Sequence, residues 1–192
     1  SGRVRVVAGR AGGLRLEVPP GDAVRPTTER VREAVFSSLG PVVVGARVLD
    51  LFAGTGALAI EALSRGAVTA VCVERSRTVA AVLGRNLDHT GLAGRVVVAD
   101  VTTFLAGDPP GEAPFGLVVC DPPYDLPDAD VAAVLAALAE PGWCAPGAVV
   151  VVERRSGSSV LPVPAGWEPT SRRTYGDTLV ERWSVDGSGS PP

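Results

Sequence analysis

The chain has 192 residues, of which 46% are hydrophobic, and its formal net charge is −3. This length suits one well-buried domain and is short for two. The apolar runs are far shorter than the roughly 20 residues needed to cross a bilayer, and no signal-peptide pattern is visible, so we expect a cytoplasmic protein without a membrane partner.

The first segment of the chain is basic and the rest is acidic. Residues 1–40 hold seven arginines against four acids, a balance of +3, whereas residues 41–192 hold 11 arginines against 17 acids, a balance of −6. A basic arm on an acidic body suits a polyanionic partner, but a solvated hairpin explains the charges equally well.

The arm itself has two predicted parts. "RVRVVAGRAGGLRLEVP" alternates in two short runs around the glycine-rich stretch Gly9–Gly13, which predicts a β-hairpin. "RPTTERVREAVFSSLG" then predicts a helix, because Thr27 or Thr28 can cap its start, apolar residues recur at helical spacing, and Gly40-Pro41 ends it.

Strands and helices alternate through the middle of the chain. Near-continuous apolar runs predict strands at 47–52, 70–74, 95–99, 117–121 and 148–153, and helical patterns lie between them at 58–65, 76–90, 102–105 and 129–140. Such runs separated by helices predict a parallel sheet covered on both faces. Beyond residue 165, "WEPTSRRTYGDTLVERWSV" predicts a hairpin that joins the sheet edge, and "DGSGSPP" predicts a disordered tail.

A glycine loop follows the first of these strands. "VLDLFAGTGALAIEAL" places Gly54, Gly56 and Ala59 at the spacing of a dinucleotide-binding fingerprint, with Glu74 at the end of the next strand. Glycines there let the backbone approach a ligand, and an acid can bind ribose hydroxyls. Taken alone, this motif fits NAD binding.

Two further acids favour a cationic ligand. Asp50 lies four residues before Gly54, where a carboxylate suits an amine better than a pyrophosphate. Asp100 ends a third strand and could accept a hydrogen bond from an adenine amino group, beside the Val101 backbone. Acids at successive strand ends therefore favour S-adenosylmethionine, although each acid could instead cap the following helix.

The fourth strand ends in Asp121-Pro122-Pro123-Tyr124, beside the same switch point of the sheet. Both prolines lack an N–H, so the corner is stiff and offers only acceptors. Two acceptors gripping the hydrogens of an exocyclic amine would aim its lone pair at a methyl group, and the Tyr124 ring could stack on an extruded base. An ordinary strand-terminating turn is the alternative.

These motifs together resemble a known family. "DLFAGTGALAIEALSRGA" and "DPPY" resemble the cofactor and catalytic motifs of Rossmann-like methyltransferases that act on amino groups. "RPTTERVREAVFSSL" and "GDTLVERW" narrow the resemblance, from about residue 3 to 184, to the RsmD-type family. Its members methylate the N2 amine of a guanine in small-subunit (16S) ribosomal RNA.

The resemblance implies roles for individual residues. Amine handling is expected at Asp121 and Pro122 and base stacking at Tyr124, with no metal. The implied S-adenosylmethionine contacts are Asp50, Phe52, Gly54, Gly56, Glu74, Asp100 and Val101. The implied RNA contacts are Arg3, Arg5, Arg10, Arg15, Arg25, Thr27 and Arg30.

We therefore expect a Rossmann-like α/β methyltransferase with a mostly parallel seven-stranded sheet, helices on both faces, an antiparallel edge hairpin and an N-terminal β-hairpin and helix. Residues 1–40 would form the RNA-binding arm, 41–185 the methyltransferase domain and 186–192 the tail. We expect a monomer acting on 16S ribosomal RNA or on an assembling small subunit.

Rival functions remain at this point. Within the enzyme class they are amino methylation of DNA adenine or cytosine and glutamine methylation in a translation factor. Enzymes that methylate such a glutamine usually carry Asn at the place of Asp121. Outside it they are an NAD-dependent oxidoreductase and a non-catalytic RNA-binding or assembly protein.

Overall fold

The computed structural model describes residues 4–21 and 27–186. The expectations for Arg3, Arg25 and almost all of the tail lie outside these residues. Within them, the predicted N-terminal hairpin is confirmed, because β1 (Val4–Arg5) pairs antiparallel with β2 (Arg15–Leu16).

Helix α1 (Glu29–Leu39) begins where its cap was predicted. Of the two candidate threonines, Thr28 is the N-cap, and its side chain accepts a hydrogen bond of 3.2 Å from the Val31 N–H. The helix ends at Gly40, and a 3₁₀ turn, η1 (Gly40–Val42), leads into the sheet. Thr27 is thereby left for another role.

The main sheet has seven strands in the order β5-β4-β3-β6-β7-β9-β8. Strands β3 to β7 run parallel, whereas β9 pairs antiparallel with both β7 and β8, so the predicted mixed sheet with a reversed edge hairpin is confirmed. Its strands are β3 (Arg47–Leu51), β4 (Thr69–Glu74), β5 (Gly94–Val98), β6 (Phe115–Cys120), β7 (Cys144–Arg155), β8 (Trp167–Tyr175) and β9 (Thr178–Val185).

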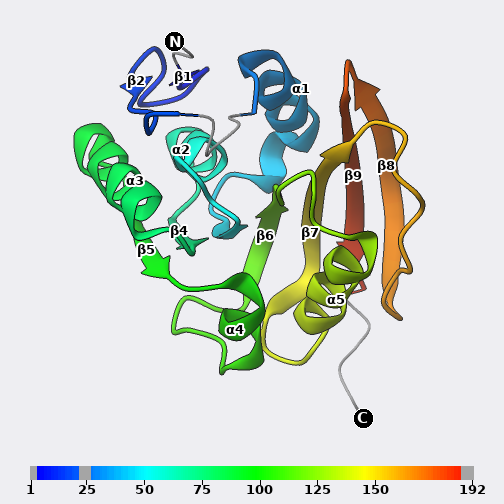
Figure 1. The fold of residues 1–192 in the computed structure, drawn as a ribbon. Helices are drawn as coiled ribbons and strands as arrows, with labels where there is room; N and C mark the ends of the chain where they lie inside the picture. The colour runs from blue at the N-terminus through cyan, green and yellow to red at the C-terminus, as the bar shows by residue number, and fades with distance from the viewer. Residues whose placement is uncertain (1–3, 22–26, 187–192) are drawn as a thin grey trace.

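Helices cover both faces of this sheet (Figure 1). The connecting helices are α2 (Ala57–Ser64), α3 (Arg77–Thr90), α4 (Val101–Ala106) and α5 (Asp128–Leu138). Side chains alternate along each strand, so Val119 and Val151 pack with α1, α2 and α3, while Val118 and Val150 pack with α4 and α5. Among the described residues, no helix has the length and apolar character required to cross a membrane.

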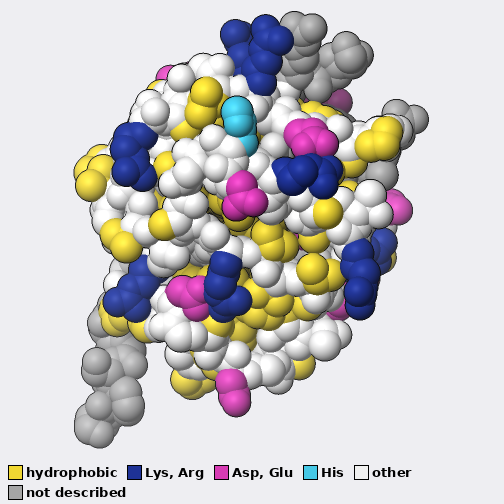
Figure 2. Space-filling model, turned by 90° about the vertical axis from the view of Figure 1, so that its left-hand side faces the viewer, with side chains coloured by type: hydrophobic (Ala, Val, Ile, Leu, Met, Phe, Trp, Pro, Cys, Tyr) yellow, Lys and Arg dark blue, Asp and Glu magenta, His cyan; other side chains and the backbone are white. Residues whose placement is uncertain are grey.

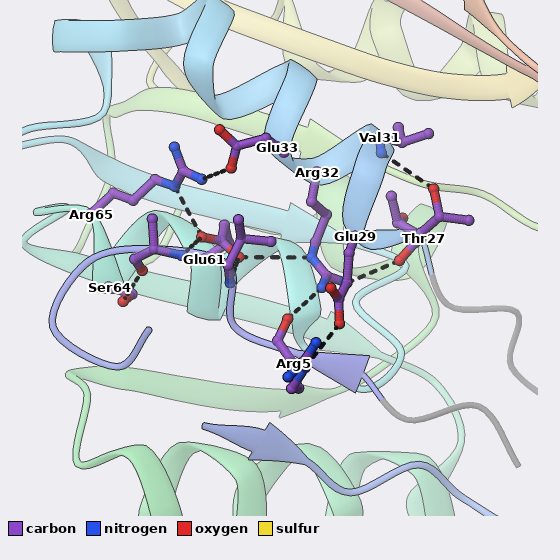
Figure 3. Close-up of polar contacts among 12 residues, drawn as sticks. Arg5, Thr27, Glu29, Val31, Arg32, Glu33, Glu61, Ser64 and Arg65 are labelled. Atoms are coloured by element: carbon purple, nitrogen blue, oxygen red, sulfur yellow. Dashed lines mark hydrogen bonds and ion pairs between the residues drawn. The ribbon is translucent and has the colours of Figure 1, made fainter. Parts of the chain in front are cut away.

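A buried ion pair joins the N-terminal segment to helix α2 (Figure 3). Arg32 on α1 and Glu61 on α2 are both buried, with 3.7 Å between Nε and Oε1. The two oxygens of Glu61 accept the backbone N–H groups of Val7 and Ala8 at 2.8 and 3.1 Å. Such a pair owes its stability to these surrounding hydrogen bonds, because burial alone would penalise both charges.

The hairpin also approaches α2 very closely. The Arg10 N–H donates to the Ser64 carbonyl at 2.8 Å, and the Ala11 N–H donates to the Ser64 hydroxyl at 2.9 Å. Gly9 lies at this contact with a φ of +83°, and a Cβ on it would lie 1.9 Å from the Ser64 carbonyl oxygen. Only glycine fits there.

We predict that Gly9→Ala lowers the free energy of unfolding by more than about 2 kcal/mol, because the hairpin must move away from α2. Gly13→Ala is the matched control, since its φ is +86° but nothing lies within 4 Å of its Cβ position. The free energy of unfolding of the control should fall by only about 1–2 kcal/mol, which is the cost of placing alanine in the left-handed conformation. Chemical denaturation of both variants measures the difference, and equal losses would contradict close docking of the hairpin.

Candidate functional site

A cavity of about 890 Å³ opens at the carboxyl ends of the parallel strands. It receives residues from the glycine loop, from the ends of β4 and β5, from the Asp121 corner and from β7. The structure therefore brings the predicted cofactor and catalytic motifs into one space, as expected at the switch point of such a sheet.

The glycine loop between β3 and α2 has an unusual backbone. Phe52, which lines the cavity, has a φ of +60°, a value rare for an aromatic residue. Gly54 and Gly56 follow with φ of +58° and +85°. The left-handed φ of Gly56 favours glycine, and a Cβ there would lie 2.1 Å from Leu83 Cδ1, so the Leu83 side chain would have to move.

Asp50 lies beneath this loop and is 1% exposed. Its Oδ2 accepts the Ala59 N–H of the first turn of α2 at 3.1 Å, and its Oδ1 has no hydrogen-bond partner within the described chain. Burial raises the pKa of Asp50 well above its ordinary value of 3.8, and the charges of Asp121 and Glu74 raise it further. A nearby cation would relieve this penalty. Asp50 and Gly56 support the cavity wall without lining it.

Glu74 and Asp100 line the cavity and also accept hydrogen bonds from backbone N–H groups. Glu74 accepts the Gly54 N–H at 3.2 Å through Oε1 and the Ser76 N–H at 2.7 Å through Oε2. Asp100 caps α4 by accepting the Thr103 N–H at 3.2 Å. A carboxylate offers about four lone-pair sites, so capping leaves each acid able to accept a ligand hydroxyl or amine. Val101 lines the cavity beside them.

The Asp121 corner lies on the other side of β3. The Asp121 N–H donates to the Leu51 carbonyl at 3.4 Å, which ties the corner to the glycine loop. The Leu126 N–H donates to the Pro123 carbonyl at 3.0 Å and closes the turn. Pro122 and Tyr124 both line the cavity, so the predicted catalytic residues lie together.

Tyr124 is held from two directions. Its hydroxyl lies 3.2 Å from the Thr178 hydroxyl, and the Arg155 guanidinium lies 5.2 Å from the ring centroid. Arg155 therefore covers one face of the ring by a cation–π contact. A base that stacks on Tyr124 must use the opposite face or displace Arg155.

Glu153, on β7, is the site residue that our sequence reasoning missed. The Thr27 hydroxyl lies 3.1 Å from Asp121 Oδ2 and 3.0 Å from Glu153 Oε2, so it bridges the two carboxyl groups. The sequence places Glu153 at the end of the strand predicted at 148–153, but it does not show that this strand end adjoins Asp121 and Thr27. Thr27, which was expected to contact RNA, lines the cavity.

The arginines of the arm do not gather at the cavity. Arg5 pairs with Glu29 at 3.4 Å, while Arg10, Arg15 and Arg30 are exposed, and none of these four lines the cavity. On the face of the molecule that includes α3 and β5, basic side chains are scattered singly, some of them beside acids (Figure 2). Their arrangement there is dispersed and forms no single patch.

No group of three or more His, Cys, Asp or Glu side chains in the described parts of the chain is arranged to hold a metal ion. The chemistry that the cavity can support thus rests on its carboxylates, its backbone groups and one aromatic ring. These groups suit positioning and charge stabilisation of a cationic ligand.

Comparisons with known proteins give consistent results. The model of the family described as "Conserved hypothetical protein 95" matches residues 4–184. The chain is 37% identical over 191 residues to "Ribosomal RNA small subunit methyltransferase D" of Escherichia coli strain K12, and the match covers 98% of this chain and 93% of that protein.

Two solved structures are similar over nearly their full lengths. The Escherichia coli protein yhhF superimposes with a TM-score of 0.85 at 35% identity, covering 97% of this chain and all of that one. A Haemophilus influenzae protein superimposes with a TM-score of 0.78 at 30% identity, covering 96% and 99% of the two chains.

The burial of Glu153 predicts a pH-dependent stability. Burial raises the pKa of Glu153 well above its ordinary value of 4.5, and the negative charges of Asp121 and Asp50 raise it further, whereas the Thr27 hydrogen bond lowers it. The cation Arg32 on α1 also acts electrostatically on Glu153. The folded state thus keeps a proton that the unfolded state loses as the pH rises above about 4.5, so this contribution to stability falls with increasing pH.

Glu153→Gln has no carboxyl proton to lose. We predict that its melting temperature, relative to that of the unsubstituted protein, rises as the pH is raised from about 5 to 8. Differential scanning fluorimetry across this range measures the difference. Glu168→Gln, at an exposed position on β8, should show no such trend. A difference for Glu153→Gln that stays constant or shrinks with pH would contradict the raised pKa.

Proposed function

Because the chain belongs to the family described as "Conserved hypothetical protein 95", we propose that it transfers a methyl group from S-adenosylmethionine to the exocyclic N2 amine of a guanine in small-subunit (16S) ribosomal RNA. The membership confirms the resemblance predicted from the sequence. The small-subunit methyltransferase D of Escherichia coli, aligned over nearly the whole chain, supports this substrate.

One observation carries the proposal: the Asp121-Pro122 corner and the glycine loop open into the same cavity. A methyl donor held at the loop and an amine held at the corner would therefore meet without any movement of the sheet. The NAD alternative loses support, because a pyrophosphate bound at the glycine loop would lie above the buried carboxyl group of Asp50.

The cavity residues suit the proposed cofactor. S-adenosylmethionine would supply an electrophilic methyl group on a cationic sulfonium. Phe52, Gly54, Glu74, Asp100 and Val101 line the part of the cavity that we assign to it. Asp50, with its unpaired Oδ1 and raised pKa, lies under the loop where a positive charge would be stabilised.

At the corner, the Asp121 carboxylate and the Pro122 carbonyl would accept the two hydrogens of the amine and direct its lone pair toward the methyl carbon. The new N–C bond forms as the C–S bond breaks, and its electron pair stays on sulfur. The proton then leaves the nitrogen through Asp121 or water. The Tyr124 ring would stack on the base. Positioning of this kind can remove several kcal/mol of the barrier.

We further propose that residues 1–40 are an RNA-binding arm. Arg10, Arg15 and Arg30 are exposed, and the arm is tied to α2 through the Arg32–Glu61 pair. A basic segment fixed to the body in this way can bind phosphates at a set distance from the cavity. The substrate would be free 16S ribosomal RNA or a small-subunit assembly particle.

The test is transfer of labelled methyl groups to small-subunit ribosomal RNA and to particles at different assembly stages. Mass spectrometry of the nucleosides should identify N2-methylguanosine at one position. Asp121→Ala should lower the transfer rate by roughly 10²–10³-fold while calorimetry still detects cofactor binding. The exposed Asp88→Ala on α3 is the control.

Two outcomes would contradict the proposal. Label found only in DNA or protein would overturn the substrate. Loss of cofactor binding in Asp121→Ala, with no separate defect in transfer, would overturn the role assigned to Asp121.

A further inference from the structure

Glu153 faces the part of the cavity that the cofactor would not fill. In the sheet order, β4 and β5 carry Glu74 and Asp100 on one side of β3, whereas β6 and β7 lie on its other side. Glu153 on β7 therefore lies beyond Asp121 as seen from the cofactor acids. If Asp121 holds the target amine, the ring that bears the amine extends toward Glu153, Thr27 and Tyr124.

One oxygen of the Glu153 carboxyl group has a hydrogen-bond partner and the other has none among the described residues. Oε2 lies 3.0 Å from the Thr27 hydroxyl, whereas Oε1 is buried and has no hydrogen-bond partner among residues 4–21 and 27–186. Glu153 is 4% exposed and lines the cavity. A buried acceptor without a partner is costly, so this oxygen points to a donor on a ligand.

The same cluster favours one carboxyl group as the carrier of a proton. Thr27 has one hydroxyl hydrogen, yet its oxygen lies within hydrogen-bond distance of two carboxyl groups. A proton on one of those carboxyls supplies the second hydrogen bond. Burial and the charge of Asp121 raise the pKa of Glu153 and favour Glu153 as its carrier. A proton on Oε2, the oxygen beside Thr27, would leave Oε1 as a bare acceptor.

An acceptor at this place discriminates among the bases that carry exocyclic amines. Beside the amine-bearing carbon on the Watson–Crick edge, adenine has the N1 lone pair and cytosine the N3 lone pair. Guanine instead has an N1–H donor there. A bare carboxyl oxygen would pair with the guanine N1–H and would face a lone pair in the other two bases.

We propose that Glu153 is the specificity-determining residue of the site: its Oε1 accepts a hydrogen bond from N1–H of the guanine whose N2 amine lies at Asp121 and Pro122. This inference rests on the proposed function and extends it to base selection. Thr27 is a positioning residue, because it orients the Glu153 carboxyl group. Arg32 holds Thr27 in turn by donating to its carbonyl at 2.9 Å.

The experiment compares guanine with 2-aminopurine, which carries the same amine but has a lone pair at N1. Small-subunit particles are reconstituted with either base at the position mapped by methyl labelling, and single-turnover rates are measured. The unsubstituted enzyme should prefer guanine by roughly 10- to 100-fold. Any effect of the missing O6 is common to all enzyme variants and cancels when their preferences are compared.

Three variants separate recognition from structure. Glu153→Met, similar in size but without an acceptor, should methylate guanine roughly 10- to 100-fold more slowly and lose the preference over 2-aminopurine. Glu153→Gln should keep the preference, because its amide nitrogen can donate to Thr27 and Asp121 while its oxygen accepts N1–H. Glu168→Met, on the exposed face of β8, is the matched control.

Calorimetric titration with S-adenosylmethionine accompanies each variant. Normal cofactor binding by Glu153→Met together with a lost preference supports the proposal. A preference retained by Glu153→Met overturns it, as does loss of folding or cofactor binding in both Glu153 variants, which would make the residue structural. Absence of methyl transfer by the unsubstituted enzyme would instead overturn the proposed function, and this inference with it.

Discussion

The register of three parallel strands determines which carboxyl groups lie together at the cavity. Leu51 on β3 pairs with Cys120 on β6, which pairs with Val152 on β7. Because side chains alternate along a strand, Asp50, Asp121 and Glu153 all point to the sheet face covered by α1, α2 and α3. Three carboxyl groups are thereby gathered at neighbouring strand ends, and their mutual repulsion favours protonation or a cationic ligand. The proposed cofactor supplies such a cation, and the proposed base supplies hydrogen-bond donors.

The N-terminal segment is part of this arrangement as well as a candidate RNA contact. Arg32 donates to the Arg5 carbonyl on β1 and to the Thr27 carbonyl, and it lies against Glu61 (Figure 3). The hairpin is therefore connected to the Asp121–Glu153 cluster through one buried guanidinium. An RNA that bound the hairpin would bind a segment whose position is coupled to the hydroxyl between the two carboxyl groups.

Local signals in the sequence predicted most of the fold and part of the site. The predicted strands and helices are confirmed with ends that differ by a few residues, because apolar periodicity and caps such as Thr28 act locally. The glycine loop and the DPPY corner were identified because their chemistry lies in adjacent residues. Glu153 was missed because its role depends on Thr27, 126 residues away, and on strand pairing that a single sequence does not reveal. The burial of Asp50 under the loop likewise depends on how α2 packs.

In the mechanism proposed above, one cavity is divided at Asp121, with the cofactor on the β4–β5 side and the base on the β7 side. A crystal structure with an S-adenosylmethionine analogue that carries an amine in place of the methyl group tests it directly. The adenine should lie near Asp100, and the analogue's amine should lie within about 4 Å of the Asp121 carboxylate, the usual limit for an ion pair. An analogue bound with its adenosine against Tyr124 and Glu153, and its amine directed away from Asp121, would rule out this division of the cavity.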